Sequence, residues 1–174
     1  MFLRLERQIN YITGEAWFEP DLLSLARLRI NLHKIPLDLV SGQPSPLESP
    51  ALGAIVLRIL AGDMHKSDIV MLDEAVKDAI RTKHTRERRG HVMGCDEVLY
   101  GRAGLLWALL NIRKREYSRE YQRALEPVFA DIPQLVEAMI TTGQQESLEL
   151  SSRGEKDALP LMWPWIDHFC GLGA

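Results

Sequence analysis

The order of hydrophobic and polar positions along this chain predicts a series of helices separated by short turns. Leucines at helical spacing predict a helix over residues 21–33, and an apolar run predicts a second helix over 51–61 that ends at Gly62. A third helix begins at Ser67, which we expect to cap it, and has one apolar stripe opposite a charged face. This single stripe is typical of a helix in an outer layer. It consists of Ile69, Leu72, Val76, Ala79 and Ile80.

Residues 98–110 form the most informative segment because they are apolar almost all the way round a helix. The segment contains a Gly-x-x-Gly turn at Gly101 and Gly104. A helix of this kind needs protein on two sides, so we predict that it is the inner member of a two-layer helical assembly. One side presents Leu99, Ala103, Leu106 and Leu110, and the other presents Leu105, Ala108 and Leu109.

Prolines and polar runs predict the remaining turns. Residues 41–50 and the polar stretch 143–158 are expected to be irregular, and the charged run 83–89 is expected to be a solvated loop. Ser118 is expected to start a later helix that runs through Leu125. Pro127 is expected to be an early helical residue, and Pro133 is expected to start or kink the next helical segment. No run of alternating β-branched residues indicates a strand. The pattern therefore predicts a single all-α region over residues 1–174.

The composition narrows the function classes. A net charge of -3 provides no basic field that would attract nucleic acid. Two cysteines, Cys95 and Cys170, do not make a disulfide framework and favour a reducing compartment. The N-terminus mixes charges too early for a secretory signal, and no stretch approaches about 18 uninterrupted apolar residues. We therefore expect a cytoplasmic protein.

Two segments carry a resemblance to a known family. The first reads Leu99-Tyr100-Gly101-Arg102-Ala103-Gly104 and leads into the apolar helix. The second reads Pro160-Leu161-Met162-Trp163-Pro164-Trp165 and is followed by Gly171-Leu172-Gly173-Ala174. In this order they resemble the first glycine turn, and the segment before the second glycine turn, of lanthionine synthetase C-like proteins of the eukaryotic type. The resemblance covers residues 68–174 well and residues 1–67 loosely.

The resemblance implies an α/α toroid in which inner and outer helices alternate. The chain then corresponds to the N-terminal portion, truncated before the second glycine turn is complete. Full-length members use zinc to activate a thiol, from glutathione or a peptide cysteine, and add it to dehydroamino acids in peptides. The family's zinc ligands belong to motifs beyond Ala174, so we expect no metal in this chain and no activity of the chain alone. Ile166 departs from the family, which has a histidine there, and the spacing of His168 and Cys170 does not suit one ion.

The glycine turn holds the candidate site residues. Candidates for ligand binding are Tyr100, Gly101, Arg102 and Gly104, and candidates for catalysis are Glu97 and Arg102. The helix start offers N–H groups to an anionic ligand group, whereas the alternative, that the glycines only permit close helix packing, is the favoured one. Arg102 either donates to a ligand or forms a salt bridge with Asp96 or Glu97. The two acids, when they have no catalytic role, are expected to cap the helix. Trp163 and Trp165 are expected to anchor the chain on the helical layer.

Two other functions stay open. One is a non-enzymatic binding or signalling module for a small, hormone-like ligand, with peripheral association with the plasma membrane. The other is a carbohydrate-active α/α toroid, which requires two carboxylates about 5–10 Å apart across the cavity. A toroid cut between helical hairpins also exposes the apolar sides of its inner helices, so we expect the chain to self-associate.

Overall fold

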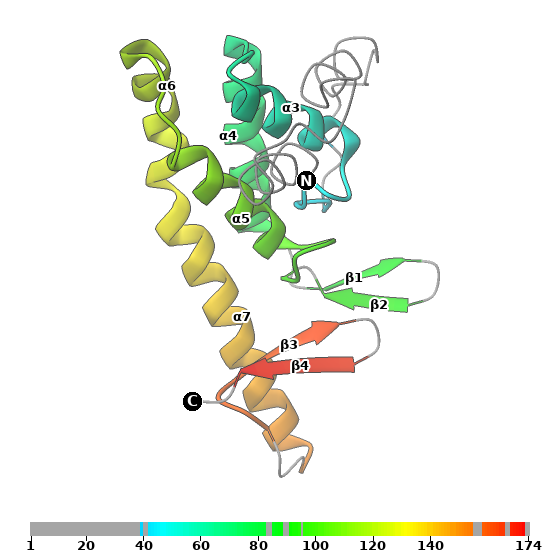
Figure 1. The fold of residues 1–174 in the computed structure, drawn as a ribbon. Coiled ribbons are helices and arrows are strands. Elements are labelled where there is room, and N and C mark those ends of the chain that lie inside the picture. Colours follow the sequence, from blue (N-terminus) through cyan, green and yellow to red (C-terminus); the bar gives the residue numbers. More distant parts are fainter. Residues whose placement is uncertain are drawn as a thin grey trace, which may run out of the picture. The chain divides into compact units, whose positions relative to one another are not determined.

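The computed structural model describes residues 39, 42–82, 85–88, 91–94, 96–154, 158–165 and 168–172. They belong to one unit of the chain, Leu37–Ala174 (Figure 1). For residues 85–88, 91–93, 164–165 and 168–172 the backbone alone is described. The predicted helix over 21–33 lies outside the described residues.

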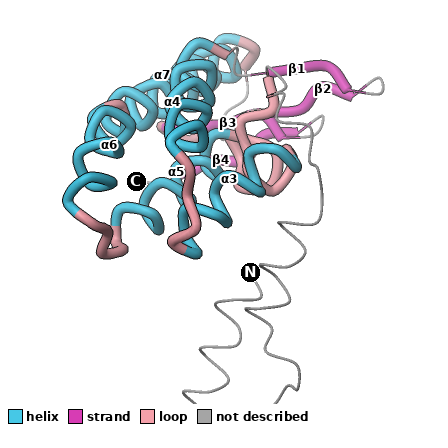
Figure 2. The backbone as a smooth tube through the Cα atoms, turned by 90° about the horizontal axis from the view of Figure 1, so that it is seen from above, coloured by secondary structure: helices cyan, strands magenta, loops and turns pink. Residues whose placement is uncertain are grey.

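Helices make up most of the described part of the chain, which confirms the helical class (Figure 2). They are α3 (Pro50–Ala61), α4 (Lys66–Arg81), α5 (Arg102–Arg113), α6 (Arg119–Ala130) and α7 (Ile132–Ser152). Each contributes side chains to one hydrophobic core, where α4 packs against α3, α6 and α7, and α5 packs against α3 and α7.

Local signals explain where α3 and α4 begin and end. The predicted end of α3 is confirmed, because Gly62 takes a left-handed φ of 84° and its N–H closes the last turn. The prediction that Ser67 caps α4 is wrong. The helix starts one residue earlier with His65 as its N-cap, and the Asp68 carboxylate accepts a hydrogen bond of 2.9 Å from the His65 backbone N–H. Four members of the predicted stripe of α4 are buried, and Ile80 is partly buried.

The later helices are longer than the pattern predicts. Ser118 caps α6 as expected, with its hydroxyl accepting from the Tyr121 N–H, and Pro133 lies in the first turn of α7. Pro127 is not an early residue, because it sits inside α6, on an exposed face where water can satisfy the backbone carbonyl that proline leaves free.

The loop predicted over 143–158 is also wrong, since α7 continues to Ser152. Its buried stripe there is largely polar or small, so no apolar period marks the helix. The buried members are Thr142, Gly143, Glu146, Ser147 and Leu150.

Two antiparallel β-hairpins accompany the helices and were not predicted. β1 (Thr85–Arg88) pairs with β2 (His91–Gly94), and β3 (Leu161–Trp165) pairs with β4 (His168–Leu172). The first strand falls within the charged run that was expected to be a loop. The sequence gives no strand signal at either hairpin, since neither has alternating β-branched residues. β1 is largely charged, and β3 contains a proline, which is rare in strands. β3 lies against α7 and beside β2, so tertiary contacts support these strands (Figure 1).

The helix of the glycine turn, α5, is buried on one flank. Leu105, Ala108 and Leu109 are fully buried against the core. On the other flank Trp107 is 41% exposed and Leu110 is 40% exposed. The prediction of burial from two directions is therefore wrong for this chain, because within the described residues only α3 and α7 pack closely on α5.

Candidate functional site

The glycine turn is held by close backbone packing. Gly101 is the N-cap of α5 in an extended conformation (φ -127°), so it does not need the left-handed freedom of glycine. Gly104 lies against the carbonyl of Val98 and the hydroxyl of Ser45, and a Cβ at this position would overlap both atoms. The Ser45 hydroxyl is buried and donates a hydrogen bond of 3.0 Å to the same carbonyl. Of the two predicted roles of Gly104, close packing is confirmed, and ligand contact stays a prediction.

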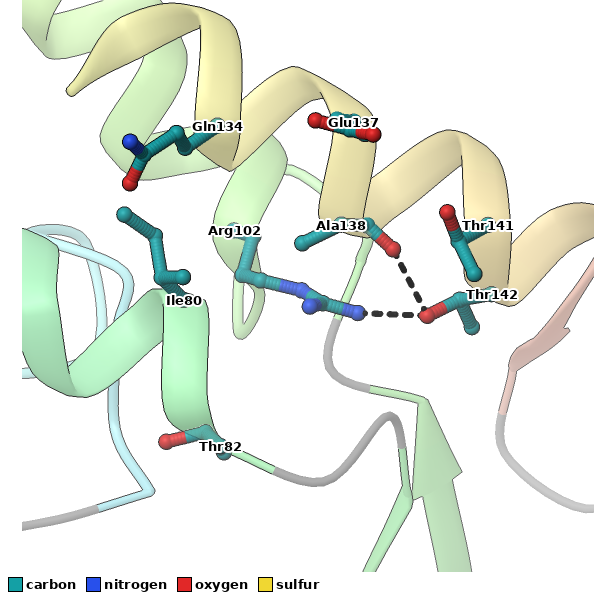
Figure 3. Close-up of a pocket in the computed structure, with 8 residues that line it drawn as sticks. All are labelled: Ile80, Thr82, Arg102, Gln134, Glu137, Ala138, Thr141 and Thr142. Carbon is teal, nitrogen blue, oxygen red and sulfur yellow. Dashed lines mark hydrogen bonds between the residues drawn. The ribbon is translucent and has the colours of Figure 1, made fainter.

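Arg102 forms a buried salt bridge, and its partner is Asp96 rather than Glu97. Nε lies 2.5 Å from Oδ1 and Nη2 lies 2.7 Å from Oδ2, a two-pronged arrangement. The side chains of Arg102 and Asp96 are only 3% and 1% exposed. Nη2 also donates to the Thr142 hydroxyl at 2.9 Å, and that hydroxyl donates to the Ala138 carbonyl at 2.9 Å (Figure 3). The pair therefore joins the start of α5 to the middle of α7.

Glu97 stabilises the turn before α5. Its carboxylate accepts hydrogen bonds from the backbone N–H groups of Leu99, at 2.7 Å, and Tyr100. The alternative in which an acid near the helix start caps α5 is not confirmed, because the N-cap of α5 is Gly101 and Glu97 binds backbone N–H groups of the turn before it. Tyr100 is half-buried. Catalytic roles of Glu97 and Arg102, and ligand binding by Tyr100 and Gly101, stay predictions.

An open cavity of about 470 Å³ lies beside the Arg102 side chain. It is an open depression bordered by the end of α4, the start of α5 and one face of α7 (Figure 3). The lining residues are Ile80, Thr82, Arg102, Gln134, Glu137, Ala138, Thr141 and Thr142. Among them only Arg102 was a candidate from the sequence. The residues of α7 were missed because nothing local in the sequence indicates that they face a turn 40 residues earlier.

Trp163 anchors β3 on α7, as predicted. Its indole Nε1 donates a hydrogen bond of 2.9 Å to the Met139 carbonyl, and its ring lies over Gly143. A Cβ at Gly143 would come within 2.7 Å of the ring, so this glycine provides the space that the indole occupies. The side chain of Trp165 lies outside the described residues.

A second arginine–aspartate pair stabilises the other end of the helical core. Arg58 of α3 donates from Nε to Asp68 Oδ2 at 3.0 Å, and its Nη2 contacts Oδ1. The hydrogen bonds to Asp68 raise the pKa of Arg58 above its ordinary value, against the opposing effect of burial. Tyr117 lies near the same core, where burial raises the pKa of its hydroxyl and the nearby Arg115 opposes the rise.

The described residues do not bring together a donor set for a metal ion. No three His, Cys, Asp or Glu side chains gather there in a ligand arrangement. Cys95 and the side chains of His168 and Cys170 lie outside the described residues, so the prediction about zinc stays a prediction. Among the described helices, none is both long and apolar enough to cross a lipid bilayer.

Comparison with known proteins adds no relative: no family model, no curated protein and no solved structure matches this chain. The described residues define a mostly helical protein with two small hairpins.

Proposed function

We propose that this chain is the N-terminal part of an α/α toroid of the lanthionine synthetase C-like kind, and that α5 is one of its inner helices. The observation that carries the proposal is the asymmetry of α5. One flank is fully buried, whereas Trp107 and Leu110 of the same helix are each about two-fifths exposed. Large apolar side chains grouped on one helix face mark an interaction surface. In a closed ring the next inner helix covers this surface.

The turn before α5 supports the same proposal. Asp96 and Arg102 fasten the start of α5 to α7, and Glu97 holds the preceding backbone. The opening of the helix is thereby fixed, which suits a wall of a central cavity. These residues act by positioning the helix.

The reaction proposed for the complete ring joins a thiol to a dehydroamino acid of a peptide. In the family that this chain resembles, zinc activates the thiol, and glutathione is the thiol in eukaryotes. The described residues do not fit a zinc site, so we assign no step of that reaction to them.

The exposed flank of α5 is tested by self-association. Without the rest of the ring, two copies of the chain bury this flank against each other. Light scattering after size-exclusion chromatography is expected to show concentration-dependent oligomers. Leu110→Glu is expected to weaken association by about tenfold or more, because it places a charge in the apolar contact. Ala124→Glu, on an exposed position of α6, is the matched control and leaves association unchanged.

A monomer at every concentration contradicts the proposal. Equal effects of the two glutamate variants also contradict it, since the association then does not involve α5. The catalytic part is tested separately with glutathione, a dehydroalanine peptide and zinc. We expect no adduct from the chain alone, and a zinc-dependent adduct detected by mass spectrometry contradicts this expectation.

A further inference from the structure

The cavity beside Arg102 is lined by a guanidinium with one donor group that no described residue uses. Nε and Nη2 of Arg102 are occupied by Asp96 and Thr142, whereas Nη1 makes no hydrogen bond within the described part of the chain. The described side-chain atoms that are both unpartnered and sealed from solvent are Asp73 Oδ1 and the Tyr117 hydroxyl. The Nη1 edge is therefore open to the cavity that Arg102 lines.

The surrounding structure holds this donor in place. Arg102 extends from α5 toward Thr142, with Ile80 on one side and Ala138 on the other (Figure 3). The side chain is only 3% exposed, so its guanidinium has little freedom to turn away. A fixed donor binds an acceptor with a small loss of conformational entropy. The cavity volume of about 470 Å³ lies in the range of small-molecule sites.

The charges around the cavity select the acceptor. The carboxylate of Asp96 balances the positive charge of Arg102 and accepts from its Nε and Nη2. Glu137 of α7 adds a negative charge to the cavity lining. A carboxylate or phosphate placed at Nη1 would share the site with these two carboxylates, whose repulsion offsets part of its attraction to the guanidinium. A neutral carbonyl avoids this repulsion and still accepts from the polarised N–H group.

We propose that this cavity binds an amide carbonyl, such as a backbone carbonyl of a peptide, through Nη1 of Arg102. The hydroxyl of Thr141 and the amide of Gln134, both on the α7 wall, are available to the neighbouring polar atoms of the same ligand. The inference uses only the cavity and its charges. It does not depend on the toroid proposal or on thiol chemistry.

The test follows the Arg102 side chain by NMR while the 174-residue chain is titrated with a capped alanine dipeptide. We expect a saturable shift of the Arg102 guanidinium resonance. Acetate and inorganic phosphate are the anionic probes, and their affinity is expected to be lower than that of the dipeptide by about tenfold or more. Tighter binding of either anion overturns the assignment of a neutral acceptor. The absence of a saturable shift with the dipeptide overturns the site.

Two variants of α7 separate binding in the cavity from an unspecific effect. Ala138→Phe fills the cavity from the wall opposite α4 and leaves Arg102 and Asp96 in place, so it is expected to abolish the shift. Ile140→Phe adds a ring at an exposed position of the same helix outside the cavity lining, and it is expected to bind as the unchanged chain does. Retained binding in Ala138→Phe overturns the proposal. If Ala138→Phe does not fold, Glu137→Gln serves instead: it is expected to leave dipeptide binding unchanged and to strengthen acetate binding, and a loss of dipeptide binding overturns the proposal.

Discussion

Removing Asp96 tests how much the buried salt bridge contributes to the stability of this protein. In Asp96→Ala the guanidinium of Arg102 keeps its charge in a site where its side chain is only 3% exposed. The Thr142 hydroxyl stays within hydrogen-bond distance, but a hydroxyl does not balance the charge. An uncompensated buried charge of this kind destabilises a protein by about 3–5 kcal/mol. Since whole domains are stable by about 5–15 kcal/mol, this loss is a large share of the total.

The measurement is urea unfolding followed by circular dichroism, which gives the free energy of unfolding of each variant. Glu149→Ala is the matched control, because its partner Arg153 lies 3.4 Å away and both side chains are more than half exposed. An exposed pair of this kind contributes about 0.5 kcal/mol or less. If Asp96→Ala fails to fold, Asp96→Asn, which removes the charge and retains an acceptor, is expected to lose less stability.

A double variant separates the charge from the packing. Asp96→Leu with Arg102→Met removes both charges and fills the site with side chains of similar length. We expect this variant to regain most of the stability that Asp96→Ala loses, because no unpaired charge remains buried. If Asp96→Ala lowers the free energy of unfolding by less than about 1 kcal/mol, the reasoning is refuted, because a buried guanidinium without its partner is expected to destabilise the fold by more than that. A double variant that is less stable than Asp96→Ala also refutes the reasoning.

Three further changes follow from the packing. Gly104→Ala is expected to lower the free energy of unfolding by about 1–3 kcal/mol, because its Cβ overlaps the backbone and the Ser45 hydroxyl, and a neutral effect in urea unfolding contradicts the close packing. Gly143→Ala is expected to displace the indole of Trp163, seen as a shifted indole N–H resonance by NMR, and an unchanged resonance contradicts this. Tyr117→Phe is expected to raise stability by up to about 1 kcal/mol, because it removes a buried hydroxyl without a partner among the described residues. Burial raises the pKa of Tyr117, so ionisation of its hydroxyl is less favourable in the folded than in the unfolded chain. The free energy of unfolding of the unchanged chain is therefore expected to decline as the pH rises above about 10, and the variant lacks this decline.

Several helix boundaries were predictable because their signals are local. Gly62 ends α3, Ser118 caps α6 and Pro133 opens α7, and in each case the residue acts on backbone groups within a few positions of itself. The apolar stripe of α4 was predictable for a similar reason, since a period of three to four residues can be seen within one helix. The cap of α4 was not predictable in the same way: Ser67 was expected there, but the less usual His65 takes the N-cap position and its N–H donates to Asp68.

The candidate site was predictable in one respect and hidden in another. The sequence pointed to Arg102 and Glu97, and it gave Asp96 as one of two partners for the arginine. Neighbouring acids give no sequence signal for which of them turns inward. The backbone decides, because it uses Glu97 to cap the turn and leaves Asp96 to face the core. The α7 wall of the cavity had no signal at all, since its buried stripe is polar or small.

The sequence by itself determined that the chain folds mainly into helices, where most of these helices begin or end, and which face of α4 is buried. These properties depend on backbone hydrogen bonds and side-chain periods that extend over a few residues. Only the tertiary structure decided that α5 is covered on one flank, that Arg102 reaches α7, and that two short hairpins form, one of them against that helix. Burial and charge pairing depend on which surfaces meet, and segments 40 or more residues apart meet only after the chain has folded.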